Sequence, residues 1–504
     1  MRILVPLLFP IFMSTLTLAH SLPTPSAITD PKQIPSKSNA QVERSLTIEK
    51  LYMTRNIGDS AWSPDGKMVA FISNISGRNN LWLVPATGGW PTQLTVSDQR
   101  QMTPAWSPDG KWIAYQSDYD GDEQWDIFFV SPKTGQVVNV TNTRQVSEET
   151  PAWSPDGRYL AYAVKPKTSS VYEVDVYDTL MRQTKHLTTD TPADKVNAYP
   201  IWSRDGKWIA YTQQQAKGTD SNIFVADVET GQSTVLTPHQ GEQLYEANDF
   251  PPDGKRLLVT SNAGNGYDNV GLLDIASKKI SWLTRDKWEV SAGQFAPSGK
   301  EVTWTANVDG NYGIYVHSLV SGKTTSLPVA AGVNQLAGAE SAFSPDGSWL
   351  LYYHEGANAP KDLWAYSRAT GKSRQLTNSL VGGVRGEDMV EPFLVHYPSR
   401  DGKWTISAFV YMPYNLPKQA ISPAIVYVHG GPNSQATNSF SRFIQYAANQ
   451  GYIVIAPNYR GSTGYGKEFQ NANLFDMGGG DLQDVLAAAE WIKQTGYVDP
   501  KKLI

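Results

Sequence analysis

One motif occurs seven times along the middle of this 504-residue chain and constrains its fold more than any other feature. The clearest copy is AWSPDGKWIAY, and the copies occupy residues 61–71, 105–115, 152–162, 201–211, 249–259, 294–304 and 342–352. Neighbouring copies therefore begin 44 to 49 residues apart. A period in this range is typical of propeller blades built from four strands, so the repeat predicts a seven-bladed β-propeller over residues 46–385.

A tight turn explains the composition of the motif. In Ser-Pro-Asp-Gly, Pro fixes φ at the second position, Asp bonds to its own backbone, and Gly adopts a positive φ. The sixth copy carries Ser298 in place of Asp. We therefore assign the motif aspartates to turns, and the tryptophans to packing between blades, rather than to a binding site.

Two acidic stretches in the repeat region could have other roles. Asp118, Asp120 and Asp122 alternate like the ligands of a calcium loop, but the twelve-residue pattern is incomplete, which favours a solvated blade loop. Glu148 and Glu149 are an adjacent acidic pair, and adjacent carboxylates on a blade loop are usually only solvated. We therefore predict no metal site and no cofactor.

The N-terminus predicts export. Residues 1–21 have the positive start, apolar core and small residues of a secretory signal peptide, with an uncleaved membrane anchor as the alternative. Residues 22–45, rich in Pro, Ser and Thr, are predicted to be a linker that is partly disordered or packed across a domain boundary. The signal and the absence of Cys favour a periplasmic or secreted protein. A net charge of -5 without basic runs predicts no nucleic-acid partner, and no later stretch predicts a membrane span.

Beyond residue 385 the blade period gives way to alternating strands and helices. Strands are predicted at residues 424–430 and 452–457, helices at 441–451 and 481–496, and the start of another strand at 501–504. Asp481 is expected to be the N-cap of the last helix and Gly496 to end it. This order predicts a parallel, helix-covered sheet, the opening half of an α/β-hydrolase domain over residues 386–504.

The sequence His-Gly-Gly-Pro, residues 429–432, directly follows the first of these strands. In α/β-hydrolases the loop after the third strand carries an HGG-type motif, and one of its N–H groups belongs to the oxyanion hole. His429 cannot be the general base, because that residue comes last in the chain order of the fold, so we expect it to brace the loop.

No nucleophile accompanies this motif. No serine has glycine at both the −2 and +2 positions, and no histidine follows His429. We therefore expect the catalytic Ser, Asp and His to be absent and the chain to be truncated before the nucleophile, within the fifth strand of the domain. Such a truncation would leave the strand at 424–428 as an open, apolar edge.

Taken together, these motifs resemble the prolyl oligopeptidase family of serine peptidases, most closely its acylaminoacyl-peptidase and dipeptidyl-peptidase-like branch. The resemblance rests on the WSPDG blades, VYVHGGPNS (426–434), PNYRGSTGYG (457–466) and GGGDLQDVLAAAEWI (478–492). It implies a propeller that caps a hydrolase domain, with the active site between them and short peptides as substrates. Tyr459 and Arg460 match a family loop near the site, and we interpret both as architectural.

The resemblance also implies roles for individual residues. Gly431, the second Gly of HGGP, matches the family's oxyanion-hole backbone donor, and Gly430 is expected to shape the turn. Dipeptidyl-type members hold the free N-terminal amine of the substrate with carboxylates, and Glu148 and Glu149 are one pair that could do so.

Two functions remain open from the sequence. The first is a serine peptidase that cleaves short peptides through a Ser-His-Asp acyl-enzyme mechanism when full length, this chain being an inactive fragment. The alternative is a periplasmic propeller that binds or scaffolds other proteins and carries a vestigial hydrolase segment. Association into a homo-oligomer is left open.

Overall fold

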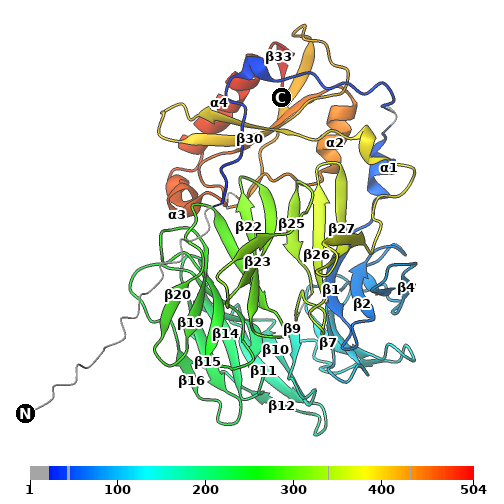
Figure 1. Cartoon of the computed structure of the whole chain (residues 1–504), viewed down its shortest axis with the longest axis vertical. Coiled ribbons are helices and arrows are strands. Elements are labelled where there is room, and N and C mark those ends of the chain that lie inside the picture. Colours follow the sequence, from blue (N-terminus) through cyan, green and yellow to red (C-terminus); the bar gives the residue numbers. More distant parts are fainter. Residues whose placement is uncertain (1–21, 43–45, 190, 339, 432) are drawn as a thin grey trace, which may run out of the picture.

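The computed structural model describes residues 22–42, 46–189, 191–338, 340–431 and 433–504. The expected signal peptide, residues 1–21, lies outside these ranges. Figure 1 shows two bodies: a propeller of blue, cyan, green and yellow strands, and above it a smaller sheet flanked by orange and red helices.

Seven four-stranded sheets form the propeller, and each is made of four strands that are consecutive in the sequence. The seven-bladed architecture is therefore confirmed. The blades are β1 to β4 (Ile57–Trp62, Met68–Ser73, Asn80–Pro85, Thr92–Gln93), β5 to β8 (Gln101–Trp106, Ile113–Ser117, Asp126–Val130, Val137–Asn139), β9 to β12 (Val146–Trp153, Tyr159–Pro166, Glu173–Asp178, Gln183–His186), β13 to β16 (Lys195–Trp202, Trp208–Gln215, Ser221–Asp227, Ser233–Val235), β17 to β20 (Tyr245–Asp249, Arg256–Ser261, Asn269–Asp274, Lys279–Trp282), β21 to β24 (Glu289–Phe295, Glu301–Val308, Asn311–Ser318, Thr324–Ser326) and β25 to β28 (Val333–Leu336, Trp349–Gly356, Ala359–Ser367, Lys372–Gln375).

The motif aspartates form turns, as predicted. In the second blade the Ser107 hydroxyl donates to Asp109 over 2.8 Å, and the same carboxylate oxygen accepts from the Lys111 N–H over 3.1 Å. Gly110 follows with a φ of 70°. The Ser–Asp hydrogen bond recurs at Ser63–Asp65, Ser154–Asp156, Ser203–Asp205 and Ser344–Asp346. Because the Ser344 hydroxyl and nearby donors favour the ionised form, the pKa of Asp346 falls to about 2.

The motif tryptophans join neighbouring blades. The indole N–H of Trp153 donates to the Ala105 carbonyl over 3.1 Å, and that of Trp202 donates to the Ala152 carbonyl over 3.0 Å. In each pair the acceptor belongs to the preceding blade. The prediction that these residues pack between blades is therefore confirmed for these copies.

No strand of the first blade completes the last one, so the ring closes through side chains and through one backbone hydrogen bond, in which the Arg55 N–H donates to the Ser379 carbonyl over 2.8 Å. Across this seam the Trp62 indole donates to the Ala342 carbonyl over 3.1 Å, and the Tyr353 hydroxyl donates to Ser60 over 2.8 Å. An apolar cluster from both blades, including Phe71 and Leu351, fills the space between the two sheets.

The second domain contains a five-stranded sheet in the order β29-β30-β32-β31-β33. Its strands are β29 (Phe393–Pro398), β30 (Thr405–Tyr411), β31 (Ser422–Val426), β32 (Ile453–Asn458) and β33 (Val498–Leu503). Its helices are α2 (Arg442–Asn449), α3 (Gly466–Gln470) and α4 (Gly480–Lys493), with short 3₁₀ turns η2 (Gly386–Asp388) and η3 (Asn471–Asn473). This is the predicted opening half of an α/β-hydrolase sheet.

Two expectations about this domain are wrong, one about its sheet and one about helix α4. The strand at 424–428 is not an open edge, because β31 pairs in parallel with both β32 and β33. The six residues of β33 suffice to cover it, which makes β33 the edge. In addition, Gly479 rather than Asp481 is the N-cap of α4, and Asp481 lies in its first turn. Gly496 adopts a φ of 81° just beyond the helix, as expected of a residue that ends it.

The segment before the propeller packs against the hydrolase domain. Ile28 forms a parallel bridge with Val395 of β29, and Ile34, next to the 3₁₀ turn η1 (Pro31–Gln33), is buried in the core of that domain. Helix α1 (Ile48–Tyr52) follows, and its Leu51 carbonyl accepts from the Arg442 guanidinium of α2 over 3.1 Å. Residues 22–42 thus cross the boundary between the domains, as Figure 1 shows in dark blue.

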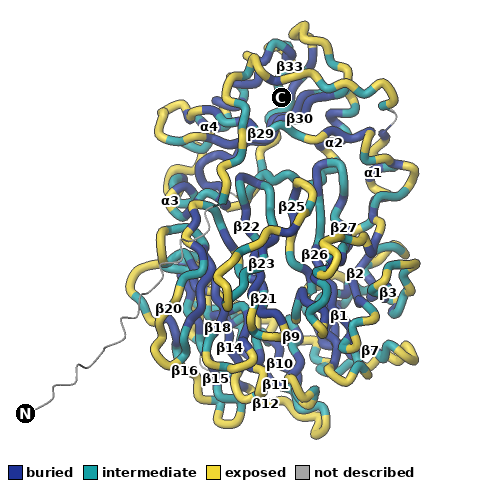
Figure 2. Tube along the Cα trace, viewed as in Figure 1, coloured by how far each residue is buried: buried dark blue, intermediate teal, exposed yellow. Residues whose placement is uncertain are grey.

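Burial follows the sheets in both domains. Figure 2 shows dark blue segments along the inner strands and yellow exposed segments at the turns on the rim of the propeller far from the second domain. No helix within the described residues is long and apolar enough to cross a membrane.

Candidate active site

His429 lies in the loop that leaves β31 and is braced by the next loop of the domain. Its ring stacks on Tyr459, with 4.5 Å between ring centroids, and its Nε2 lies 2.8 Å from the Ser462 hydroxyl. The Tyr459 hydroxyl donates to the His429 carbonyl over 2.8 Å. Burial lowers the pKa of His429, which favours the neutral ring. These contacts are those of a residue that holds a loop in place.

Gly431 adopts a conformation that other residues resist. Its φ is 132°, and a Cβ at this position would lie 2.7 Å from the Asn433 nitrogen. Gly431 is also exposed, and its N–H donates no hydrogen bond among the described residues. The backbone here can therefore present an N–H group to a ligand.

Gly430 does not need to be glycine for the turn. Its φ is not positive, and a Cβ would meet no atom within 4 Å. The expected turn-shaping role therefore has no support in the backbone conformation. The Gly430 carbonyl instead lies 3.0 Å from His429 Nδ1.

Arg460 is an architectural residue in this structure. Its buried guanidinium donates to Asp484 of α4 over 2.7 Å and to Asp401 of the β29–β30 turn over 2.9 Å. These two carboxylates raise the pKa of Arg460, and Arg460 in turn lowers the pKa of Asp401. The ion pairs connect the β29–β30 turn, the loop after β32 and helix α4.

The pair Glu148 and Glu149 lies on strand β9 and not on a solvated loop, so that expectation is wrong. Glu148 is 3% exposed, and one of its carboxyl oxygens is buried without a partner among the described residues. Burial raises the pKa of Glu148 to about 8. Glu149 accepts from Ser147 over 2.9 Å and from the Tyr172 hydroxyl over 2.8 Å. The two carboxyl groups therefore do not form an open pair for a substrate amine.

The three aspartates of the second blade have separate partners. Asp118 is buried and pairs with Arg100 over 2.9 Å, whereas Asp120 accepts from the Gln99 side chain over 3.2 Å. Asp122 accepts from the Gln124 N–H over 3.0 Å. Within the described residues, no cluster of three or more His, Asp or Glu side chains could hold a metal ion.

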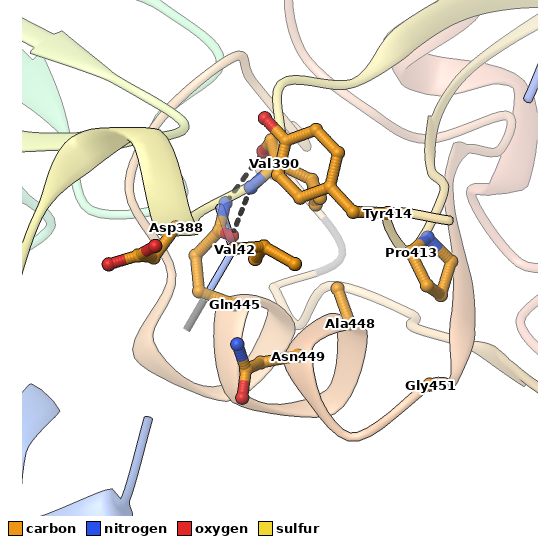
Figure 3. Close-up of a pocket in the computed structure, with 9 residues that line it drawn as sticks. All are labelled: Val42, Asp388, Val390, Pro413, Tyr414, Gln445, Ala448, Asn449 and Gly451. Atoms are coloured by element: carbon orange, nitrogen blue, oxygen red, sulfur yellow. Dashed lines mark hydrogen bonds between the residues drawn. The ribbon is translucent and has the colours of Figure 1, made fainter. Parts of the chain in front are cut away.

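The propeller contains a large cavity, and a much smaller one lies beside α2. A cavity of about 920 Å³ runs along the propeller axis, and the Ser-Pro turns of the blades line it together with the inner strands. The described residues of the HGGP loop do not line it. The second cavity, beside α2, has about 10 Å³ of space, enough for roughly one water. Figure 3 shows that Gln445 points into this small site and bonds to Val390.

Sequence reasoning missed Asp309, which the structure brings to the base of the candidate site. Asp309 lies on the hairpin between β22 and β23 and is fully buried against the hydrolase domain. Its carboxylate accepts from the Tyr465 hydroxyl over 2.8 Å. The only signal in the sequence is Asp309-Gly310 at a hairpin, which predicts a turn but not its burial.

Comparisons with known proteins agree with this geometry. Residues 47–200 and 191–383 match the TolB beta propeller domain, and residues 438–504 match the prolyl oligopeptidase family. Dipeptidyl aminopeptidase BIII of Pseudoxanthomonas mexicana is 24% identical over 86% of this chain and 63% of its own length. Dipeptidyl-peptidase 5 of Porphyromonas gingivalis is 25% identical over 56% of this chain and 42% of its own length. The chain thus spans less than two thirds of these relatives.

Solved structures share the fold. A puromycin-hydrolyzing peptidase of Mycobacterium tuberculosis superposes with a TM-score of 0.78 and 17% identity, covering 94% of this chain and 76% of that one. A structure from a study of two prolyl endopeptidases gives a TM-score of 0.76 at 19% identity, covering 92% of this chain and 70% of that one. From its repeats, its HGGP loop and these matches, the chain belongs to the prolyl oligopeptidase family of serine peptidases.

Proposed function

We propose that this chain contributes a substrate-gating propeller and one oxyanion-hole donor to a serine peptidase that cleaves short peptides. The observation that carries the proposal is the exposed N–H of Gly431, held in a glycine-only conformation directly after β31. An N–H aimed at a developing oxyanion contributes about 3 kcal/mol to transition-state stabilisation. The dipeptidyl-peptidase names of the relatives support peptides as the substrate class.

The nucleophile, the general base and its carboxylate partner are proposed to lie outside residues 1–504. This proposal is supported by the absence of a serine flanked by glycines at −2 and +2 and of any histidine after His429. The proposed reaction is attack by a serine on the peptide carbonyl, with the hydroxyl proton passing to histidine and then to the leaving amine. We favour the peptidase over a binding scaffold because Gly431 has a glycine-only conformation and an exposed N–H directly after β31.

The test compares the protein expressed from its native gene with residues 1–504 expressed alone. A fluorophosphonate probe is expected to label the native gene product and to leave residues 1–504 unlabelled. Labelling of residues 1–504 would contradict the assignment of the nucleophile, and the absence of peptidase activity in both proteins would favour the scaffold.

The oxyanion donor is tested by Gly431→Ala in the active protein. We expect kcat to fall by about 10²- to 10³-fold, because the added Cβ displaces the loop and its N–H group. Gly451→Ala is the matched control, since Gly451 also has a positive φ (91°) but lies beyond α2 in open space. An equal loss of kcat in both variants would indicate general backbone strain and contradict the assignment.

We also propose that the protein is exported to the periplasm or secreted, on the basis of the first 21 residues. N-terminal sequencing of the protein recovered from cells is expected to begin near residue 20 to 22. A mature protein that begins at Met1 would contradict cleavage.

A further inference from the structure

The hairpin between β22 and β23 extends from the sixth blade into the hydrolase domain. We call residues 307–311 the blade-6 tip. Asp309 and Gly310 at its end have φ values of 53° and 78°, and both residues are buried. A Cβ at Gly310 would lie 2.7 Å from the ring of Phe409, a core residue of strand β30. The tip therefore fits closely into the second domain.

The Asp309 carboxylate connects three separate elements of that domain. It accepts from Tyr465 over 2.8 Å and from the Ser407 hydroxyl over 2.5 Å, and it lies 2.6 Å from His396 Nε2. Buried carboxylates are tolerated only where such donors satisfy them. Asp309 thus fixes the position of the tip relative to β29, β30 and the loop after β32.

The blade-6 tip also holds the segment that follows HGGP, residues 433–438, which we call the oxyanion-loop flank. The Asn438 N–H donates to the Gly310 carbonyl over 2.9 Å, and the Asn438 side chain donates to Asn311 over 2.9 Å. Asn307 donates to the Gln435 side chain over 2.7 Å. Three hydrogen bonds from the propeller thus hold a segment only a few residues from Gly431.

The opposite side of the flank is held by the hydrolase domain itself. Asn458 accepts from the Ala436 N–H over 2.7 Å and donates to the Tyr465 hydroxyl over 2.8 Å. Because Tyr465 in turn donates to Asp309, the hydrogen bonds form a closed circuit through both domains. A Cβ at Gly464 would lie 2.8 Å from the Asn307 amide, so the circuit leaves no free space there.

We propose that the blade-6 tip is a positioning element for the oxyanion hole, with Asp309 and Asn311 as positioning residues. The proposal rests on the proposed function of Gly431. When the propeller is docked, the tip holds the flank and with it the direction of the Gly431 N–H. When the domains separate, the flank loses three hydrogen bonds, and the donor is no longer held in place. The propeller then does more than restrict access, because its contact completes the catalytic geometry.

Amide hydrogen exchange on residues 1–504 tests the positioning without any need for activity. In Asp309→Asn, and in the milder Asn311→Ala, we expect the amides of Ala436 and Asn438 to exchange about tenfold faster or more. Asp120→Asn is the matched control, because Asp120 also has a positive φ (50°) in a blade hairpin but bonds only within its own blade. Exchange that changes by less than about twofold in both test variants, or that rises equally in the control, overturns the proposal.

Kinetics on the active protein separate this proposal from the proposed function. We expect Asp309→Asn and Asn311→Ala to lower kcat by about tenfold or more while KM stays within about twofold, because the oxyanion forms only in the transition state. Unchanged kcat in an active protein overturns the positioning role. A wild-type protein without peptidase activity refutes the proposed function. In that case hydrogen exchange by itself tests whether the blade-6 tip positions the oxyanion-loop flank.

Discussion

Glu148 offers a test of the propeller core, because a carboxyl group that is buried with one unpartnered oxygen should destabilise the fold once it ionises. We predict that Glu148→Gln stabilises the protein at high pH. Glutamine has nearly the same shape and keeps the acceptor for the Thr143 hydroxyl, but it carries no charge. Desolvation, opposed in part by that hydroxyl and reinforced by Asp126, raises the pKa of Glu148 from 4.5 to about 8.

The sign and size of this stability change follow from the linkage between proton binding and folding. Since the folded state binds the proton more tightly than the unfolded state, stability falls as the pH rises from 4.5 to about 8 and then levels off. Each pKa unit corresponds to about 1.4 kcal/mol, so the full effect is bounded by about 5 kcal/mol. We expect Glu148→Gln to differ little from wild type near pH 4 and to be more stable by about 2 to 5 kcal/mol above pH 8.

The measurement is urea unfolding followed by tryptophan fluorescence at several pH values, with the difference between variant and wild type as the readout. Titrations shared by both proteins cancel in this difference. Glu149→Gln is the control, because a glutamine oxygen can still accept from Ser147 and Tyr172, so the stability should change by less than about 1 kcal/mol. A stability difference for Glu148→Gln that does not grow with pH would refute the reasoning.

Three further predictions concern other parts of the molecule. Asp484→Ala should destabilise the hydrolase domain by about 3 to 5 kcal/mol in urea unfolding, because it leaves the buried Arg460 partly unpaired; a loss below about 1 kcal/mol would contradict this. Ser298→Asp should raise the stability by about 0.5 to 1 kcal/mol, since it restores the turn carboxylate that bonds to the Lys300 N–H, and a lower unfolding midpoint would argue against it. Gly464→Ala should weaken docking of the two domains, seen as faster proteolysis between them, whereas unchanged cleavage would show that the contact can relax.

The parts of the structure that depend on local sequence could be predicted. Each WSPDG turn is complete within about six residues, so seven copies at a regular period specify seven blades. The HGGP sequence is likewise a local feature of one strand end, but the positive φ falls on Gly431 and not on Gly430, which was expected to shape the turn.

The features that could not be predicted depend on contacts between residues far apart in the chain. Glu148 is buried because of how β9 packs within the ring, and two adjacent glutamates give no sign of it. Asp309 and Tyr465 are 156 residues apart, and only the docking of the domains brings them together. The edge expected at 424–428 was wrong because a strand of six residues is enough to pair with β31.

The seam between the first and last blades has a consequence for folding. Within each blade the strands are consecutive, so every sheet can form through short loops. The seam contacts join residues far apart in the chain, 293 positions for Tyr353 and Ser60, and a backbone hydrogen bond from Arg55 to Ser379 together with side-chain contacts opposes the entropy of this closure. We therefore expect the ring to close last, after the blades have formed, and to be the first part of the propeller to open when stability is lowered.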